Sequence, residues 1–184
     1  MALTLVLAVA VGTRLGRLDL IEFKADEAQV AGLALDAAHG LWPAASIATS
    51  NGVDNPPLPL YLFALPALFT RDPAWLAAAS GLLDVLAVLL VFVIGRRYFS
   101  GRAGLAGAAF YAAAAYPALF ARKLAGPYLQ PFFAALLLWC LLAIATASPL
   151  PPKRERARVR ELGAVAGSSA ADWPIALRHF SSLL

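Results

Sequence analysis

Residues 75–95 read WLAAASGLLDVLAVLLVFVIG, and this stretch decides the fold class of the chain. The run is long enough for a membrane crossing, because about 20 predominantly apolar residues in a helix span a hydrocarbon core of ~30 Å. Its apolar residues are nearly continuous and do not alternate with polar ones, so the pattern favours a helix over a strand. We therefore predict a membrane-spanning helix over residues 75–95.

The whole chain has the composition of a membrane protein. Hydrophobic residues make up 61% of the 184 residues and charged residues 14%, with a mean hydropathy of +0.72. Soluble domains average about 25% charged residues. Because backbone polar groups in lipid need partners within the protein, only helices and closed barrels span membranes. Apolar runs rich in Leu and Ala select helices, so we predict an all-α, polytopic membrane protein with about four transmembrane helices.

Three further apolar runs complete the four predicted helices. Residues 128–147 have the length of a span, and residues 105–120 are predicted to be an Ala-rich span. Residues 1–18 form a shorter first span if their two arginines extend to the membrane surface. A cleaved signal peptide is the alternative for the first eleven residues, but a basic region at its start is missing.

The distribution of Arg and Lys predicts the topology, because cytoplasmic loops carry an excess of both. Segments 96–102 and 153–160 are basic and poor in acids, so we place both inside. The acid-bearing segment 14–73 then faces outside, and both termini are cytoplasmic in a multi-pass protein of the cell (plasma) membrane. The number of crossings agrees with this topology only if the apolar run 57–69 is interfacial or re-entrant. A short true span is the alternative.

The chain divides into a membrane module and a tail. Residues 1–147 form the module, in which Gly104 and Gly107 allow close helix packing. Residues 148–184 begin at a proline-rich change in composition and are predicted to be a basic, poorly ordered cytoplasmic tail. The net charge of +4 is gathered in a few short stretches, so it reports topology and indicates no nucleic-acid partner.

The external segment carries the residues best suited to chemistry. Asp26 and Glu27 open a stretch of helical composition that runs to His39. A turn signal, Asp54-Asn55-Pro56-Pro57, follows. A polar, acid-bearing segment between apolar ones is where chemistry at a membrane surface is expected, and a carboxylate can act there as a general base. Acids in the first turn of a helix are also favoured by the macrodipole alone, which is the structural alternative for this pair.

An ordered set of motifs resembles a known enzyme class. Asp26-Glu27 precedes Asn55-Pro56-Pro57-Leu58-x-x-Tyr61, then Arg96-Arg97-Tyr98-Phe99-Ser100-Gly101, then a loop that begins Arg122-Lys123. Residues 1–147 thereby resemble the N-terminal portion of membrane glycosyltransferases of the GT-C fold. The resemblance is to the protein O-mannosyltransferase-like group (glycosyltransferase family 39), to which aminoarabinose transferases are similar.

The sequence departs from that group at several points. Asn55 stands where relatives often have Lys or His, and Gln130 lies near the place of a common acid. The family's chains are longer, so the resemblance implies a truncated chain that corresponds to an N-terminal module.

The resemblance implies a function at the external membrane face. The donor is a sugar linked to polyprenyl phosphate, and the acceptor is a hydroxyl of a lipid, protein or glycan. Asp26 is implied as the catalytic base, and Glu27 as the residue that orients the site or binds the acceptor. The metal dependence of relatives differs, so a divalent metal is possible as a cofactor although no metal ligands are assigned. The implied substrate-binding residues are Lys24, Asn55, Tyr61, Arg122 and Lys123.

Several of these residues also have structural explanations. Arg122 and Lys123 suit an interfacial anchor, and Asn55 suits a turn before proline. Asp84 lies near the middle of the 75–95 helix, where an acid is a functional-site hypothesis by default. Because the sequence shows no evident basic partner for it, we predict a neutral, hydrogen-bonded packing acid.

Two alternative functions belong to other classes. One is a non-catalytic membrane fragment: a truncated product, or a small scaffold that associates with other helices through Gly104 and Gly107. Half of a transporter is less favoured, because transporter spans carry polar residues along the substrate path.

Overall fold

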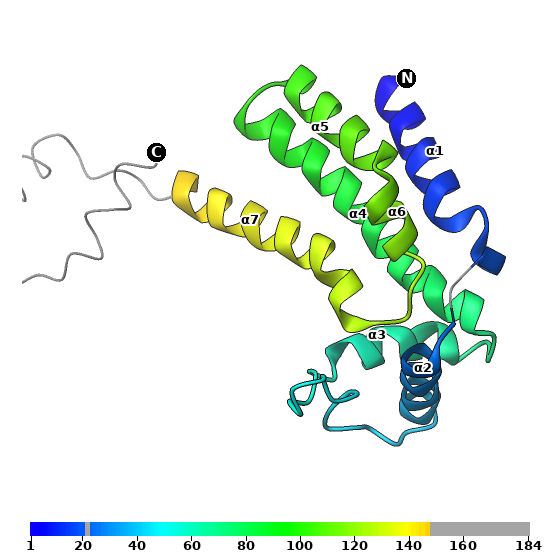
Figure 1. Cartoon of the computed structure of the whole chain (residues 1–184). Helices are drawn as coiled ribbons and strands as arrows, with labels where there is room; N and C mark the ends of the chain where they lie inside the picture. The colour runs from blue at the N-terminus through cyan, green and yellow to red at the C-terminus, as the bar shows by residue number, and fades with distance from the viewer. Residues whose placement is uncertain (21–22, 148–184) are drawn as a thin grey trace, which may run out of the picture. The chain divides into compact units, whose positions relative to one another are not determined.

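The computed structural model describes residues 1–20 and 23–147, and the described chain is helical (Figure 1). The only pairing of β type that these residues show is a bridge between Ala48 and Asp54. The all-α prediction is therefore confirmed. The α-helices are α1 (Ala2–Leu15), α2 (Ala25–Ala38), α3 (Leu58–Ala67), α4 (Pro73–Tyr98), α5 (Gly101–Ala113), α6 (Ala115–Phe120) and α7 (Gln130–Ala147), with 3₁₀ turns η1 (Leu18–Leu20) and η2 (Gly126–Leu129).

Two helical segments of the described chain are long and apolar enough to cross a membrane. They are Pro73–Tyr98, which is α4, and Gly126–Ala147, which joins η2 to α7. The helix predicted over 75–95 is thus confirmed and is longer than predicted. A first compact unit comprises Met1–Leu142, and the contacts below lie within it. The predicted poorly ordered tail, 148–184, lies outside the described residues.

The helix predicted over residues 105–120 is interrupted, and in this respect the prediction of one continuous span is wrong. Helix α5 ends at Ala113, Ala114 is extended with a ψ of 122°, and α6 begins at Ala115. Pro117 gives the physical reason. A proline has no N–H, and its ring collides with the carbonyl four residues earlier, here that of Ala113. The break leaves carbonyls at the end of α5 without their usual helical donors.

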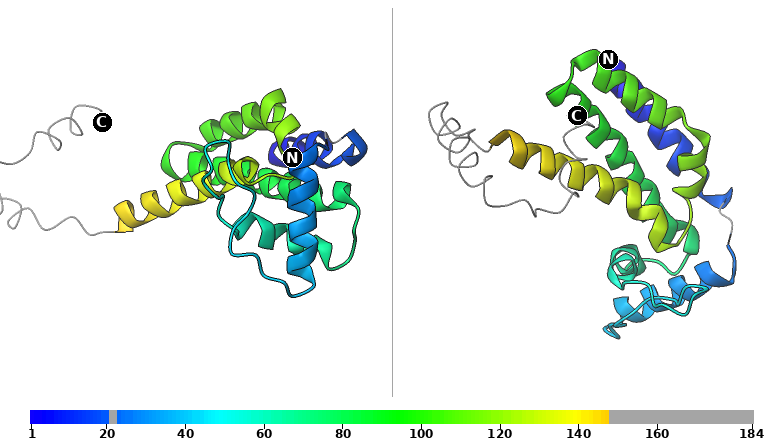
Figure 2. Two further views of the ribbon diagram at one scale, coloured as in Figure 1. Left: turned by 60° about the horizontal axis from the view of Figure 1, so that its bottom comes forward. Right: turned by 60° about the vertical axis from the view of Figure 1, so that its left-hand side comes forward.

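Helices α1, α4 and α5 lie side by side, and α4 and α5 form a hairpin (Figures 1 and 2). The hairpin is tightest at Gly95 and Gly104. A Cβ added to Gly95 would lie 2.5 Å from the Cα of Gly104, and one added to Gly104 would lie 2.6 Å from the backbone N of Arg96. The predicted close approach is confirmed there. It is looser at Gly107, where an added Cβ would lie 3.4 Å from Val91 Cγ1.

Helices α2 and α3 form a small layer at the end of the bundle where α4 begins (Figure 1). Val30 and Ala34 of α2 pack in one buried cluster with Leu60 and Phe63 of α3, and Leu76 extends this cluster into α4. Helix α3 has 10 residues, which give about 15 Å of rise against a core of ~30 Å. The helix is therefore shorter than a straight crossing requires, and the interfacial or re-entrant placement of segment 57–69 stays a prediction.

Candidate functional site

The two adjacent acids at the start of α2 occupy different environments. Asp26 is exposed, whereas Glu27 is only 6% exposed. The Oε2 of Glu27 accepts a hydrogen bond of 3.1 Å from the backbone N of Lys24, which closes the first turn of the helix. Glu27 is therefore used as part of the helix cap. Asp26 lies in the same turn, and it is exposed to solvent.

The other predicted residues of the external segment hold the loop between α2 and α3. Asn55 is half-buried, and its Nδ2 donates 2.8 Å to the carbonyl of Ile47. Tyr61 donates its hydroxyl 2.7 Å to the carbonyl of Pro43 and meets the ring of Trp42 edge-on, with centroids 5.2 Å apart. Asn55 thus bonds within the loop, and Tyr61 joins the loop to α3. Asn55 and Tyr61 can contact a ligand only through the parts of their side chains that these bonds and ring contacts leave open.

Arg122 and Lys123 lie in the segment between α6 and η2. Arg122 donates through Nη2 to the carbonyl of Thr13 and through Nη1, at 3.4 Å, to that of Arg17. It therefore caps the end of α1, where the helix carries partial negative charge. The Nζ of Lys123 lies 5.3 Å from the ring centroid of Phe120 and 5.9 Å from that of Tyr128. These rings hold a cation just before the first residues of η2.

A cavity of about 550 Å³, called here the loop cavity, opens beside Asn55. Its lining is mainly apolar with a few polar groups, which is the usual composition of a small-molecule site. Val30 of α2 lines it, one helical turn beyond Asp26. The 46–59 loop, η2 and α7 supply the rest of its walls; these include Ser46, Asn55, Leu58, Pro127, Gln130, Phe133 and Leu137.

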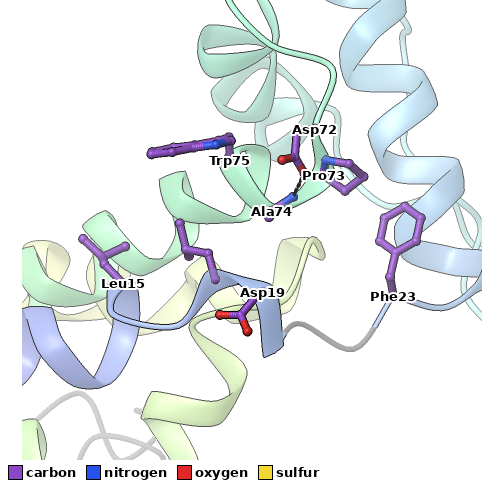
Figure 3. Close-up of a pocket in the computed structure, with 8 residues that line it drawn as sticks. Leu15, Asp19, Phe23, Asp72, Pro73, Ala74 and Trp75 are labelled. Carbon is purple, nitrogen blue, oxygen red and sulfur yellow. Dashed lines mark hydrogen bonds between the residues drawn. The ribbon is translucent and has the colours of Figure 1, made fainter.

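A second cavity, of about 690 Å³, lies between the end of α1 and the start of α4 and is called here the helix-end cavity (Figure 3). Phe23 and Trp75 contribute aromatic rings to its lining, and Asp19 and Asp72 contribute carboxylates. Asp72 caps α4 by accepting a hydrogen bond of 2.9 Å from the backbone N of Ala74. A hydrogen bond from Arg17 lowers the pKa of the exposed Asp19, so this carboxylate stays ionised at neutral pH.

The largest correction concerns Asp84. The prediction of a neutral packing acid without a basic partner is wrong, because Arg14 Nε lies 2.6 Å from Asp84 Oδ2. Arg14 is 0% exposed and Asp84 3%. The hydroxyl of Tyr111 donates 2.6 Å to the other carboxylate oxygen. The expectation that Arg14 extends to the surface fails for the same reason. The residue turns inward and joins α1, α4 and α5.

The break after α5 completes this buried cluster. Arg14 also donates through Nη1 to the carbonyl of Ala112 at 2.8 Å and through Nη2 to that of Tyr111 at 3.0 Å. Both carbonyls lie in the last turn of α5, where the interruption at Ala114 removes the usual donors four residues further on. The carbonyl of Tyr111 also accepts from the backbone N of Ala114 at 3.3 Å. Each nitrogen of the guanidinium and each oxygen of the carboxylate has a partner, so the cluster holds α1, α4 and α5 together. In the sequence, Pro117 indicates that nearby carbonyls lack their usual helical donors.

The predicted residues are therefore only partly brought together. Lys24, Asp26 and Glu27 share the start of α2, and Asn55 and Tyr61 share the adjoining loop and α3. Arg122 and Lys123 contact α1, α4 and aromatic rings instead. Within the described residues, no three His, Cys, Asp or Glu side chains gather in a way that could hold a metal ion. The chain matches no known protein family, no curated protein and no solved structure.

Proposed function

We propose that this chain is a membrane glycosyltransferase module that transfers a sugar from a polyprenyl-phosphate donor to an acceptor hydroxyl. One observation carries the proposal: along the chain, Asp26 lies between a residue that lines one cavity and a residue that lines the other. Phe23, three residues before it, lines the helix-end cavity, and Val30, four residues after it, lines the loop cavity. An exposed carboxylate in such a place can serve two substrates that approach from different sides.

The proposed membrane placement has α1, α4, α5 with α6, and α7 as its spans. Helix α4 has 26 residues, or about 39 Å of rise, which exceeds the ~30 Å core. Asp72 caps its beginning, and Arg96 and Arg97 occupy its last turn. We place the arginine end in the cytoplasm and the α2–α3 layer outside, by the excess of basic residues in cytoplasmic loops. Both termini are then cytoplasmic in the plasma membrane.

The donor is assigned to the loop cavity. Its apolar lining suits the first isoprene units of a polyprenyl chain, and the faces of Asn55 and Gln130 that border the cavity suit the sugar phosphate. Lys123 precedes Ala125 and Gly126 of the cavity lining by two and three residues. Its ammonium group is the nearest cation along the chain for the departing phosphate. The acceptor is assigned to the helix-end cavity, whose two rings and two carboxylates suit a hydroxylated ligand.

The proposed reaction is a single displacement. The Asp26 carboxylate takes the proton of the acceptor hydroxyl as its oxygen attacks the anomeric carbon. The bond between that carbon and the phosphate oxygen breaks, and the polyprenyl phosphate leaves with the electron pair. The configuration at the anomeric carbon is inverted. Glu27 positions this turn of the helix through its bond to Lys24 N, and the proposal needs no proton transfer from it.

A second candidate function is a non-catalytic scaffold that packs against other membrane helices. Helix α7 favours it, because none of its described residues is buried. Leu137 and Leu141 are exposed on its apolar surface. Such a surface suits lipid or neighbouring helices equally well. The scaffold makes no use of the two cavities, so donor binding separates the two candidates.

The test is binding of polyprenyl-phosphate mannose to the purified chain in lipid nanodiscs. Phe133→Trp enlarges a side chain that lines the loop cavity, and we expect about tenfold weaker donor binding. Phe110→Trp is the matched control, because Phe110 is 81% exposed on α5 and lies outside the cavity lining. Equal donor affinity for both variants, or no binding by the unaltered chain, would contradict the proposal and favour the scaffold.

A further inference from the structure

The turn between α4 and α5 is basic, exposed and free of acids. Arg96, Arg97 and Arg102 are all exposed there. The sequence has no Asp or Glu between Asp84 and Glu155, so no carboxylate of this hairpin lies near the turn. Within the described residues these guanidinium groups form no ion pair; Arg97 lies over the ring of Tyr98, at 5.8 Å from its centroid. The patch therefore has the charge needed to bind an anion.

The close helix crossing brings the three arginines to one place. Gly95 and Gly104 are in backbone contact, and a Cβ added to Gly104 would lie 2.6 Å from the backbone N of Arg96. Arg102 is two residues before Gly104, and Arg97 is two residues after Gly95. Ser100 fixes the turn by accepting a bond of 3.1 Å from the backbone N of Ala103. The arginines thus lie at the ends of two helices joined by a short turn rather than on a long loop.

An apolar side chain stands within the same turn. Phe99 is 78% exposed, between Arg97 and Arg102 in the sequence. In water this exposure would be unfavourable, whereas at a membrane surface an aromatic ring can enter the interfacial region beside lipid headgroups. The combination of guanidinium groups and an exposed ring fits a phospholipid better than a free phosphate, because only the lipid offers both anion and apolar contact.

We propose that the α4–α5 turn binds the headgroups of anionic phospholipids in the cytoplasmic leaflet. The inference rests on the proposed membrane placement and is independent of sugar transfer. All acids of the external segment that the structure describes lie before Pro73, at the other end of α4. The two ends of the bundle therefore differ in charge, and lipid binding at the arginine end holds α4 and α5 at a fixed depth.

The experiment measures the affinity of the full chain for phosphatidylglycerol against phosphatidylcholine. Chain in nanodiscs of phosphatidylcholine is titrated with each lipid, and bound lipid is counted by native mass spectrometry. The variants are Arg102→Gln, the triple Arg96→Gln/Arg97→Gln/Arg102→Gln, and Arg71→Gln. Arg71 is the matched control, because it is exposed at the opposite end of α4. The basic segment 153–160 is the same in all of them, so differences report the turn.

We expect Arg102→Gln to weaken phosphatidylglycerol binding about fivefold and the triple variant more than tenfold, with phosphatidylcholine unchanged. Arg71→Gln should bind like the unaltered chain. Phe99→Ser should weaken binding of the long-chain lipid but not of glycerol phosphate, which distinguishes a lipid site from an anion site. Equal binding by the triple variant and by Arg71→Gln would overturn the proposal, as would a Phe99→Ser variant that binds the lipid normally. A chain that does not enter nanodiscs would refute the membrane placement, whatever its lipid affinity.

Discussion

The helical bundle and the α2–α3 layer use their charged residues in opposite ways. In the bundle, Arg14 and Asp84 are buried and every contact is directed at another part of the protein. In the layer, Asp26 is exposed while its neighbour Glu27 is used by the helix cap. The difference separates charges that hold helices together from charges that are open to a substrate. We expect variants in the bundle to change stability and Asp26 variants to change chemistry.

The largest expected effect is in the bundle. Asp84→Leu leaves the Arg14 guanidinium buried without its counter-ion, and breaking one partner of a buried pair costs about 3–5 kcal/mol. We expect unfolding of the chain in detergent, followed by circular dichroism, to show a loss of this size. The exposed pair Arg17–Asp19 gives the control, because Asp19→Asn should leave the stability almost unchanged.

A double variant sharpens this test. Arg14→Met combined with Asp84→Leu removes both charges and leaves apolar side chains, so it should recover most of the stability that Asp84→Leu loses. If the double variant loses as much stability as Arg14→Met and Asp84→Leu lose together as single variants, the two charges do not act as a pair. The division between bundle and layer would then have lost its main support.

A smaller effect is expected at the helix crossing. Gly104→Ala places a Cβ 2.6 Å from backbone atoms of α4, so the hairpin must open, at a cost of about 1–3 kcal/mol. Gly107→Ala is the matched control, because its nearest neighbour is a side-chain carbon at 3.4 Å. The same unfolding measurement should show a larger loss for Gly104→Ala. Equal changes in the two variants would mean that both act only through the helix propensity of alanine, which they share, and that the crossing is not tight.

The smallest expected effect lies in the layer. Tyr61→Phe removes the hydrogen bond to the Pro43 carbonyl and keeps the ring against Trp42, so it should cost about 0.5–1.5 kcal/mol. Tyr116→Phe is the control at an exposed ring. Hydrogen exchange of the 43–61 backbone amides should rise in Tyr61→Phe alone. If donor binding is lost without faster exchange, Tyr61 contacts the substrate directly, as the resemblance implies.

The sequence predicted local features well. The helical stretch predicted over 26–39 is α2, at Ala25–Ala38, and the close approach at Gly104 is present. The separation of Asp26 from Glu27 also followed from the rotation of about 100° between successive helical residues. These features depend on residues near one another in the chain, which periodicity and capping patterns describe.

The Arg14–Asp84 pair could not be predicted in the same way. Its partners are 70 residues apart, and their meeting depends on how α1 packs against α4. An arginine near the end of an apolar run fits a surface anchor as well as a buried ligand of carbonyls. The interruption of α5 was accessible, since Pro117 marks it, but its consequence for Arg14 was not. The two cavities likewise arise from tertiary packing, and no motif indicated Val30 or Phe133 as lining residues.

The most direct test of the central claim compares Asp26→Asn with Glu27→Gln. Transfer from polyprenyl-phosphate mannose is measured in vesicles that carry this module within a full-length enzyme, beside donor affinity and thermal stability. We expect Asp26→Asn to lower transfer by about a hundredfold or more, with donor affinity and stability nearly unchanged, because only basicity is removed. Glu27→Gln should instead lower stability, because it weakens the bond to Lys24 N. Near-normal transfer by Asp26→Asn, with reduced stability, would contradict the account and make Asp26 a helix-terminal acid only.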